Sequence, residues 1–448
     1  MAYHTFEALG QKMLYDPCTE AILQIDSVVY DLMQQKESNE QEKIEALKAR
    51  YDEKTLQDAL QEIQTLIDEG ILSASDREHE PLARPEPVIK ALCLHVAHDC
   101  DLRCRYCFAS QGDFKGNREL MSAETGKKAL DFLVQNSGNR RNLEVDFFGG
   151  EPLLNFSVVK ELTLYGEALN KKHNKNIRFT ITTNGVALDD DKIDFINEHM
   201  SNVVMSLDGR KEVHDRMRPT RNQKGSYDTV LPKFKKLLAS RGNKDSFIRG
   251  TFTGYNLDFD KDVLHFFDEG FTSVSMEPVV TDESLDYAIQ KDDLEAIKQS
   301  YERLAKEFLQ RKRENPALQF FHFMVDLTDG PCLAKKRMGC GAGVEYVSIT
   351  PNGDIFPCHQ FVGEKEFIIG NLEEGINNPA LIETFKQANV DQKEACRACW
   401  NQNFCSGGCH ANAWFNNQDL MKPYENGCEM QKKRTELALG LHAAESFE

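Results

Sequence analysis

The sequence lacks an excess of basic residues and lacks any long apolar run. Its 448 residues include 72 acidic side chains against 54 basic ones, which gives a formal charge of −18. A nucleic-acid binder would carry a basic surface, so this balance excludes that class of partner. No apolar run approaches the roughly 20 residues of a membrane span, and the N-terminus lacks the features of a signal peptide. We therefore expect a cytoplasmic protein with no nucleic-acid or membrane partner.

Cysteine is absent from the long stretch between positions 107 and 332. Three of the thirteen cysteines lie just before this gap and eight lie beyond it, while Cys18 and Cys93 are isolated. In a large chain without a secretion signal, this density indicates metal or redox chemistry rather than disulfides. The gap predicts two cysteine-bearing regions with different roles. We interpret Cys18 and Cys93 as ordinary apolar thiols.

Strand-like and helical segments alternate over residues 88–312. Six strands are predicted, at Val88–Val96, Leu143–Phe148, Ile177–Thr183, Val203–Leu207, Phe247–Thr253 and Ser273–Glu277. The intervening and following helices are predicted at Ala123–Gln135, Ser157–Lys171, Asp190–Glu198, Tyr227–Ala239, Phe259–Asp268 and Leu294–Arg311. This alternation predicts an α/β fold with a parallel sheet, arranged as an open, partial (β/α)6 barrel. The active site of such a fold lies at the C-terminal ends of the strands.

Residues 1–80 form a separate pattern. Two short strands are predicted, followed by three helices; the segments are Thr5–Leu9, Ala21–Ile25, Ser27–Lys36, Gln41–Asp52 and Thr55–Glu69. Short strands with three helices indicate a winged-helix-like domain. The alternative is an N-terminal extension without a role of its own. The proline-rich, charged stretch Ser73–Pro87 is predicted to be a linker.

Polar and glycine motifs follow each of the first four predicted strands. The first is a CxxxCxxC loop formed by Cys100, Cys104 and Cys107. The others are Gly149-Gly150-Glu151-Pro152, Thr182-Thr183-Asn184-Gly185 and Ser206-Leu207-Asp208-Gly209. Because the C-terminal ends of parallel strands meet at one rim, we expect these motifs to converge there.

Three thiolates on one short loop can each bind one iron of a 4Fe–4S cluster and leave the fourth iron open. That open iron suits the amino and carboxylate groups of S-adenosylmethionine (SAM). The alternative is a zinc site, for which His95 or His98 would supply the fourth ligand.

Three features resemble the radical SAM superfamily over roughly residues 88–310. They are the cysteine loop with Tyr106 before its last Cys, the Gly149–Pro152 motif and the six βα units. The resemblance implies that Gly149 and Gly150 accept the SAM amino group through backbone oxygens, with Glu151 beside them. It also implies a ribose contact for Asn184, a carboxylate or ribose contact for Ser206, and adenine packing by Tyr106 and Phe108. For Asn184 and Ser206, ordinary turn chemistry is the alternative. The segment with Asp208 and Arg218 resembles peptide-modifying members.

The cysteine order over residues 330–448 resembles the SPASM domain, which carries two auxiliary 4Fe–4S clusters, for a total of three with the first. The resemblance assigns Cys340, Cys358 and Cys409 to one cluster, and Cys396, Cys399, Cys405 and Cys428 to the other. The fourth ligand of the former is either Cys332 or a substrate thiolate, and we favour the open site. Zinc ribbons are the alternative. Since periodicity fades after residue 330, we expect this region to fold around metal rather than a large apolar core.

The order of the three regions, residues 1–80, 88–312 and 330–448, resembles that of maturases of ribosomally made peptides. Residues 94–100 and the loop to Gly112 resemble in particular the sactionine-forming SCIFF peptide maturases. The resemblance implies that residues 1–80 bind the leader of a Cys-rich precursor peptide as an added strand. It further implies a thioether between a peptide Cys sulfur and an α-carbon, and an electron donor such as flavodoxin or ferredoxin. One alternative is a sulfatase-maturase-like enzyme that oxidises a single peptide residue. The other is a non-catalytic, zinc-stapled peptide-binding adaptor.

Overall fold

The computed structural model describes residues 3–35, 39–74, 87–325, 327 and 338–446. No helix in these ranges is long and apolar enough to cross a membrane. The predicted linker lies mostly outside the described residues, and Cys332 lies outside them as well.

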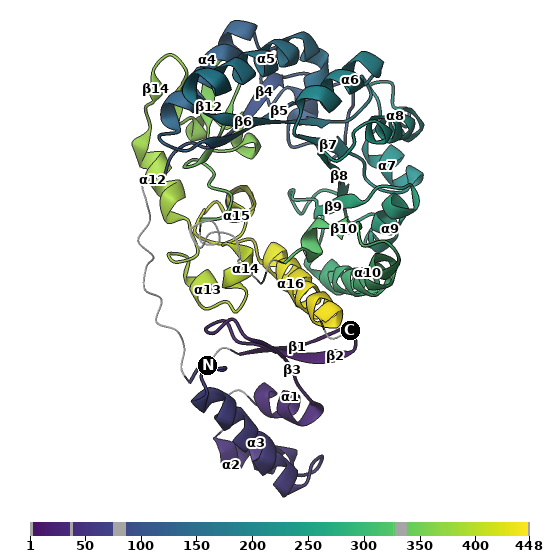
Figure 1. The fold of residues 1–448 in the computed structure, drawn as a ribbon, viewed down its shortest axis with the longest axis vertical. Coiled ribbons are helices and arrows are strands. Elements are labelled where there is room, and N and C mark those ends of the chain that lie inside the picture. Colours follow the sequence, from purple (N-terminus) through teal and green to yellow (C-terminus); the bar gives the residue numbers. More distant parts are fainter. Residues whose placement is uncertain (1–2, 36–38, 75–86, 326, 328–337, 447–448) are drawn as a thin grey trace.

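The centre of the molecule is an open, partial barrel of parallel strands with helices on its outer side (Figure 1). Its six strands are β4 (Ala91–Ala97), β5 (Asn142–Gly149), β6 (Asn176–Thr183), β7 (Asn202–Ser206), β8 (Asp245–Phe252) and β9 (Ser273–Pro278). They lie side by side in chain order and pair in parallel. The predicted α/β partial barrel is therefore confirmed, with strand ends within a few residues of those predicted.

The outer helices follow the predicted order. They are α4 (Ala123–Asn136), α5 (Phe156–His173), α6 (Asp190–His199), α7 (Lys211–Met217), α8 (Tyr227–Ala239), α9 (Asp260–Asp268) and α10 (Leu294–Glu314). Short 3-10 turns are η1 (Ser110–Gly112), η2 (Pro152–Asn155), η3 (Lys291–Asp293), η4 (Phe321–Phe323), η5 (His359–Phe361) and η6 (Lys365–Phe367). Helix α7 was not expected, because it is only two turns long and inserted before α8.

The sheet extends beyond the barrel on both sides. Strand β10 (Gln319–Phe320) adds to β9 in parallel. On the other edge, β11 (Tyr346–Ile349) pairs in parallel with β4, and β12 (Asp354–Phe356), β13 (Gly370–Asn371) and β14 (Gly375–Ile376) continue antiparallel. The C-terminal region is thus built directly onto the first barrel strand, and all these strands form one eleven-stranded sheet.

The C-terminal region also contains helices α12 (Pro379–Gln387), α13 (Glu394–Arg397), α14 (Gln402–Cys405), α15 (His410–Asn417) and α16 (Glu425–Ser446). A second apolar cluster forms here, with Phe356, Phe361, Phe367 and Phe385 buried at its centre. The sequence did not predict this small apolar cluster, because its four aromatic side chains come from separate short elements without helical or strand periodicity. Folding of the region around metal stays a prediction.

The N-terminal unit has a three-stranded antiparallel sheet of β1 (His4–Ala8), β2 (Gln11–Tyr15) and β3 (Ile22–Gln24). Its three helices are α1 (Ser27–Gln34), α2 (Glu40–Leu47) and α3 (Glu53–Asp68), which share a small apolar core. The sequence analysis missed β2. A two-residue turn at Leu9 and Gly10, both with positive φ, joins it to β1, and Leu-Gly is a much weaker hairpin signal than Asn-Gly.

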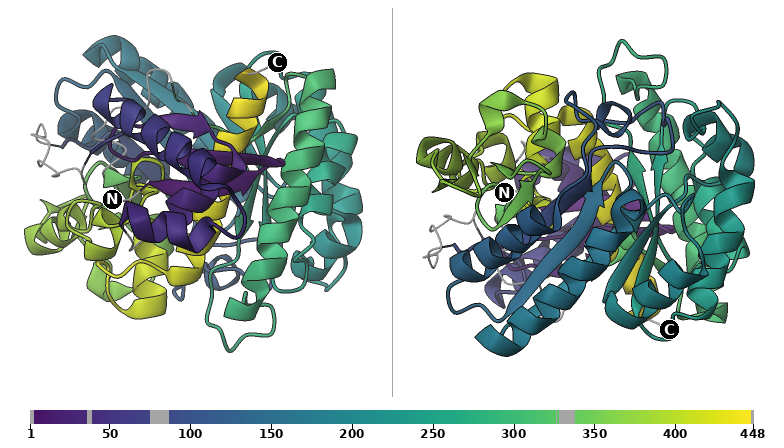
Figure 2. Two further views of the ribbon diagram at one scale, coloured as in Figure 1. Left: turned by 90° about the horizontal axis from the view of Figure 1, so that it is seen from below. Right: turned by 90° about the horizontal axis from the view of Figure 1, so that it is seen from above.

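Helix α16 lies between this N-terminal sheet and the barrel (Figures 1 and 2). Phe6 and Met13 of the sheet belong to the same buried cluster as Leu437 and Leu439 of the helix. The backbones come so close that a Cβ on Gly440 would lie 2.5 Å from the Cβ of Ala8. The N-terminal unit is therefore packed onto the rest of the molecule rather than tethered to it.

Substituting Gly440→Leu tests this packing. The larger side chain has no room against β1, so we expect the free energy of unfolding to fall by about 1–3 kcal/mol and residues 1–74 to become sensitive to protease. Urea denaturation and limited proteolysis measure the two effects. Gly116→Leu is the control, because only the Asp113 carbonyl oxygen lies near that Cβ, at 3.5 Å. Equal behaviour of the two variants would contradict the predicted packing.

Candidate functional site

The loop that carries Cys100 is paired with the glycine motif after β5. The backbone N–H of Gly150 donates to the Ala97 oxygen at 2.8 Å, and that of Glu151 donates to the Asp99 oxygen at 2.9 Å. A Cβ on Gly149 would lie 2.2 Å from the Ala97 oxygen, and one on Gly150 equally close to the Asp99 oxygen. Only glycine permits this approach, so the motif fixes where the cysteine loop begins.

Glu151 connects the ends of β5 and β6 from a fully buried position. Its carboxyl accepts from Leu153 N–H at 3.0 Å, from the Thr183 hydroxyl at 2.7 Å and from Asn184 N–H at 2.8 Å. Burial raises the pKa of Glu151 to about 8. Because three protein donors already occupy its carboxyl group, Glu151 holds the C-terminal ends of β5 and β6 together. Its contact with SAM stays a prediction.

Asn184 reaches from the end of β6 to the cysteine loop. Its side-chain amide donates to Asp101 Oδ1 at 2.7 Å and lies 3.5 Å from Cys100 Sγ. Ser206 is half-buried at the end of β7. The four rim motifs therefore converge at one edge of the sheet, as the parallel topology requires.

Asp208 forms a buried charge network under the same loop. Its carboxylate accepts from the Tyr106 hydroxyl at 2.6 Å and from Thr251 N–H at 3.1 Å, and it forms an ion pair with Arg218 Nε at 3.0 Å. Burial raises the pKa of Cys104 to about 12, and Arg218 acts in the opposite direction. A cation beside a buried thiol favours the thiolate that iron binds, so this surrounding fits a cluster ligand.

Phe108 lies in a different environment from Tyr106. The centroid of its ring lies 6.5 Å from that of Phe148, in a stacked arrangement, and 5.6 Å from that of His359, which follows Cys358. His359 Nδ1 lies 2.8 Å from the Tyr346 hydroxyl and 3.8 Å from Cys358 Sγ. The two aromatic residues predicted beside the adenine thus face different neighbours, and their contact with SAM stays a prediction.

The C-terminal thiols form two groups. In the first, the pKa of Cys358 is raised by burial and then by Cys409 and Cys340, and that of Cys409 by burial and Cys340. In the second, the pKa of Cys428 is raised to about 12 by burial and then by the other three members, Cys405, Cys396 and Cys399. These mutual influences follow the grouping that the resemblance assigns, and the assignment of these thiols to two clusters stays a prediction.

No three Cys, His, Asp or Glu side chains in the described ranges gather tightly enough to hold a single metal ion.

Lys393 is a buried cation that sequence reasoning missed. It is 1% exposed, and its ammonium donates to the Gly407 oxygen at 3.0 Å. Burial lowers its pKa, while Cys396, Cys405, Cys409 and Cys428 act to raise it. A buried charge requires an opposite partner, and thiolates of both groups would supply it. No sequence signal distinguishes this lysine from its neighbours.

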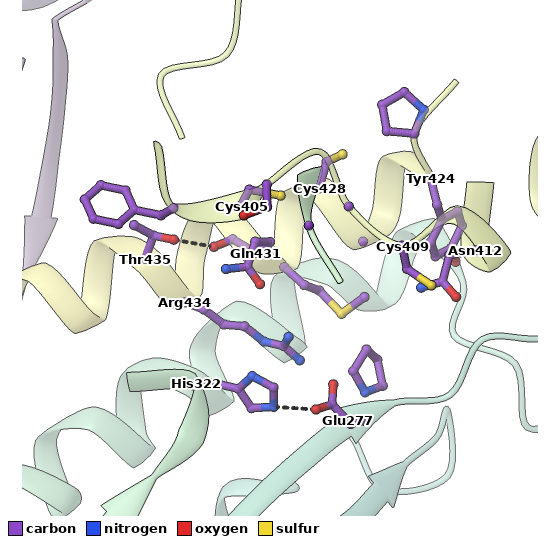
Figure 3. A pocket seen from close by; sticks show the side chains of 18 of the residues that line it. Glu277, His322, Cys405, Cys409, Asn412, Tyr424, Cys428, Gln431, Arg434 and Thr435 are labelled. Carbon is purple, nitrogen blue, oxygen red and sulfur yellow. Dashed lines mark hydrogen bonds and ion pairs between the residues drawn. The ribbon is translucent and has the colours of Figure 1, made fainter. Parts of the chain in front are cut away.

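Members of both groups line one cavity of about 810 Å³. Cys340 and Cys409 come from the first group, Cys405 and Cys428 from the second. The opposite wall includes Glu277, at the C-terminal end of barrel strand β9 (Figure 3). The C-terminal thiols therefore face the end of the barrel at which the cysteine loop lies.

Comparisons with known proteins agree with this architecture. Residues 94–268 match the family model of the Radical SAM superfamily, and residues 340–400 match that of SPASM, an iron-sulfur cluster-binding domain. A relative is the cysteine-type anaerobic sulfatase-maturating enzyme of Clostridium novyi. It is 27% identical over 331 residues, which cover 71% of this chain and 86% of that protein.

Two solved structures share the fold. One is native anSMEcpe with bound AdoMet and Cp18Cys peptide, with a TM-score of 0.64 at 18% identity, covering 81% of this chain and 100% of that one. The other is Streptococcus suis SuiB bound to precursor peptide SuiA, with a TM-score of 0.55 at 18% identity, covering 95% and 98%.

The chain therefore contains a radical SAM domain at residues 94–268 and a SPASM domain at residues 340–400, and these domains indicate SAM and 4Fe–4S clusters as cofactors. Within that class, the matches support the radical SAM/SPASM peptide maturase family.

The buried pair of Asp208 and Arg218 generates a prediction. Arg218→Met leaves Asp208 charged and buried, so we expect the free energy of unfolding to fall by about 3–5 kcal/mol. The double variant Asp208→Asn/Arg218→Met removes both charges and should recover part of this loss. Anaerobic urea denaturation of the wild type, Arg218→Met, Asp208→Asn and the double variant measures the coupling. Additive losses would show that the two side chains do not interact as described.

Proposed function

We propose that this enzyme forms a thioether between a Cys sulfur and an α-carbon of a ribosomally made, Cys-rich precursor peptide. The observation that carries the proposal is the shared cavity, in which thiols of both C-terminal groups face the rim of the barrel. A peptide segment in this cavity would lie between Cys340 and Cys409 and the C-terminal end of β9, which belongs to the same barrel rim as the cysteine loop. A substrate Cys sulfur held near Cys340 and Cys409 would then lie close to an α-carbon radical formed at the barrel side of the same peptide segment.

The residues have distinct roles in this proposal. Cys100, Cys104 and Cys107 would hold the cluster that binds SAM and supplies the radical. The two C-terminal groups would hold one auxiliary cluster each, to accept the electron released on bond formation. Gly149 and Gly150 bring the backbone close to SAM. Glu151 and Asn184 fix the loop. Flavodoxin or ferredoxin is the proposed electron donor.

The N-terminal unit supports a peptide substrate that carries a leader. Its sheet ends in β1 on one side and β3 on the other, and an outer strand can pair with an extended peptide. The fold shared with SuiB covers 95% of this chain, and SuiB is bound in that structure to its precursor peptide SuiA. We propose that residues 1–80 hold the leader while the core peptide enters the cavity.

A second candidate is oxidation of a single residue in a protein or peptide. The relative from Clostridium novyi, a sulfatase-maturating enzyme, favours this reaction. Both reactions remove two hydrogen atoms from the substrate. They differ in whether a Cys becomes cross-linked.

Mass spectrometry separates the two reactions. We expect reconstituted enzyme, a reductant, SAM and a Cys-rich peptide encoded by a neighbouring reading frame to give a product lighter by two hydrogen atoms per cross-link. The modified Cys should no longer react with iodoacetamide, since its sulfur is bonded to carbon. Tandem spectra that show an oxidised residue and an alkylatable Cys would favour the second candidate. SAM cleavage with an unchanged peptide would overturn both.

Metal content tests the three-cluster assignment and the adaptor alternative. Three cubane clusters give about twelve iron and twelve sulfide ions per chain. Cys428→Ala removes one ligand of the second group, and we expect it to lose about four of the irons. Cys18→Ala, outside every group, serves as control and should retain them all. A few zinc ions in place of iron would instead support a zinc-stapled adaptor.

A further inference from the structure

We infer that Arg434 and Glu277, on facing walls of this cavity, form a subsite for the main chain of the substrate peptide, with Arg434 as donor and Glu277 as acceptor. The inference rests on the proposed function, because it assumes a peptide in the cavity. It goes further in naming which side chains hold that peptide and which of its groups they bind.

Arg434 carries the first part of the argument. It lies on α16, is 6% exposed, and its Nε donates to the Tyr301 hydroxyl at 2.7 Å. Its Nη2 is buried and has no hydrogen-bond partner among the described residues. Figure 3 shows the side chain reaching from α16 toward His322 and Glu277 on the facing wall. A buried guanidinium nitrogen without an acceptor is costly, so a ligand oxygen that Nη2 meets after a small shift of the side chain into the cavity would complete the site.

Glu277 supplies the complementary group. Its Oε1 lies 3.3 Å from His322 Nε2, and 29% of its side chain remains exposed, against 6% for His322. Burial acts to raise the pKa of Glu277, but His322, Arg434 and Arg249 hold it well below its usual value. The carboxylate is therefore ionised and accessible, and it can accept a hydrogen bond from an N–H group.

The charges of the site select the ligand. Apart from His322, Glu277 and Arg434 are the only acidic and basic side chains among the described residues that line the cavity, so a carboxylate ligand would gain from Arg434 and be repelled by Glu277. A peptide unit is uncharged and offers both a carbonyl oxygen and an N–H. The site therefore matches main chain better than an acidic side chain.

The rest of the cavity fits an extended peptide. Phe321 and Met324, which are 54% and 55% exposed, line it on the same side as His322, and they offer apolar surface to substrate side chains. Cys340 and Cys409 also line it. A volume of about 810 Å³ falls within the roughly 300–1,000 Å³ of ligand sites. A main chain held at Arg434 would thus lie in the same cavity as thiols of the first auxiliary group.

Arg434→Met tests the donor, and Lys433→Met is the matched control. The control removes the same charge from α16, but Lys433 pairs with Glu302 at 2.6 Å and is not among the residues that line the cavity. The probe is a synthetic core peptide without its leader, so that the N-terminal unit does not dominate affinity. We expect Arg434→Met to raise Kd about tenfold and to release more 5′-deoxyadenosine per modified peptide, while Lys433→Met matches the wild type.

Two further variants separate ligand binding from a structural role. Tyr301→Phe removes the internal partner of Arg434 and leaves Nη2 in place, so we expect binding to persist. Glu277→Met removes both acceptor oxygens and should weaken binding even if Arg434→Met fails to fold. Iron content and thermal stability are measured for each variant. Wild-type affinity in folded Arg434→Met, or equal loss in Tyr301→Phe, would overturn the inference.

The chemical form of the ligand is tested on the peptide. Core peptides with Asp and Glu replaced by Asn and Gln, and with an amidated C-terminus, should bind as tightly as the original. If they bind weakly and no longer respond to Arg434→Met, the ligand is a carboxylate and the main-chain assignment is wrong. These results concern affinity, whereas the identity of the product is read separately by mass spectrometry. Failure of the subsite is therefore distinct from failure of the thioether proposal.

Discussion

The parallel pairing of β11 with β4 is the contact on which the functional architecture depends. An open barrel leaves its first strand with an unpaired edge, which proteins normally cover. Here the C-terminal region covers it, with Val347 opposite Leu92 and Ile349 opposite Leu94. Lys90 donates its backbone N–H to the Glu345 oxygen at 2.8 Å, and the two side chains form an ion pair. A slip by one residue would exchange the buried and outward faces, so this register fixes Cys358 relative to the cysteine loop.

Buried cations distinguish the surroundings of the thiols from an ordinary core. Arg218 lies near Cys104, and Lys393 lies among the C-terminal thiols. An apolar surrounding raises the pKa of a thiol, whereas a nearby cation lowers it. At both positions an apolar side chain would cost less free energy to bury than a charged one. Their presence is explained when the thiols are ionised and bound to iron, which fits the cofactors that the two domains indicate.

The sequence predicted the features that depend on local pattern or on one topological rule. The six barrel strands alternate visibly, and the rim motifs converge because parallel strands end together. Helix α16 escaped notice because it is buried on several sides: Leu437, Leu439 and Leu441 all belong to the core, so no single apolar face appears in its sequence. The facing positions of Glu277, His322 and Arg434 arise only when β9, η4 and α16 come together.

Helix α16 also joins the parts of the molecule that the proposed reaction needs to coordinate. Cys428, Arg434 and Gly440 lie along it at intervals of six residues, or about 9 Å each. The first belongs to the second thiol group, the second reaches into the cavity, and the third lies against β1 of the N-terminal sheet. One continuous helix therefore contacts the thiols, the cavity and the N-terminal unit. A movement of β1 would therefore act on the helix that places Arg434. In the proposed function, α16 would connect the unit that binds the leader with the cavity that binds the core peptide.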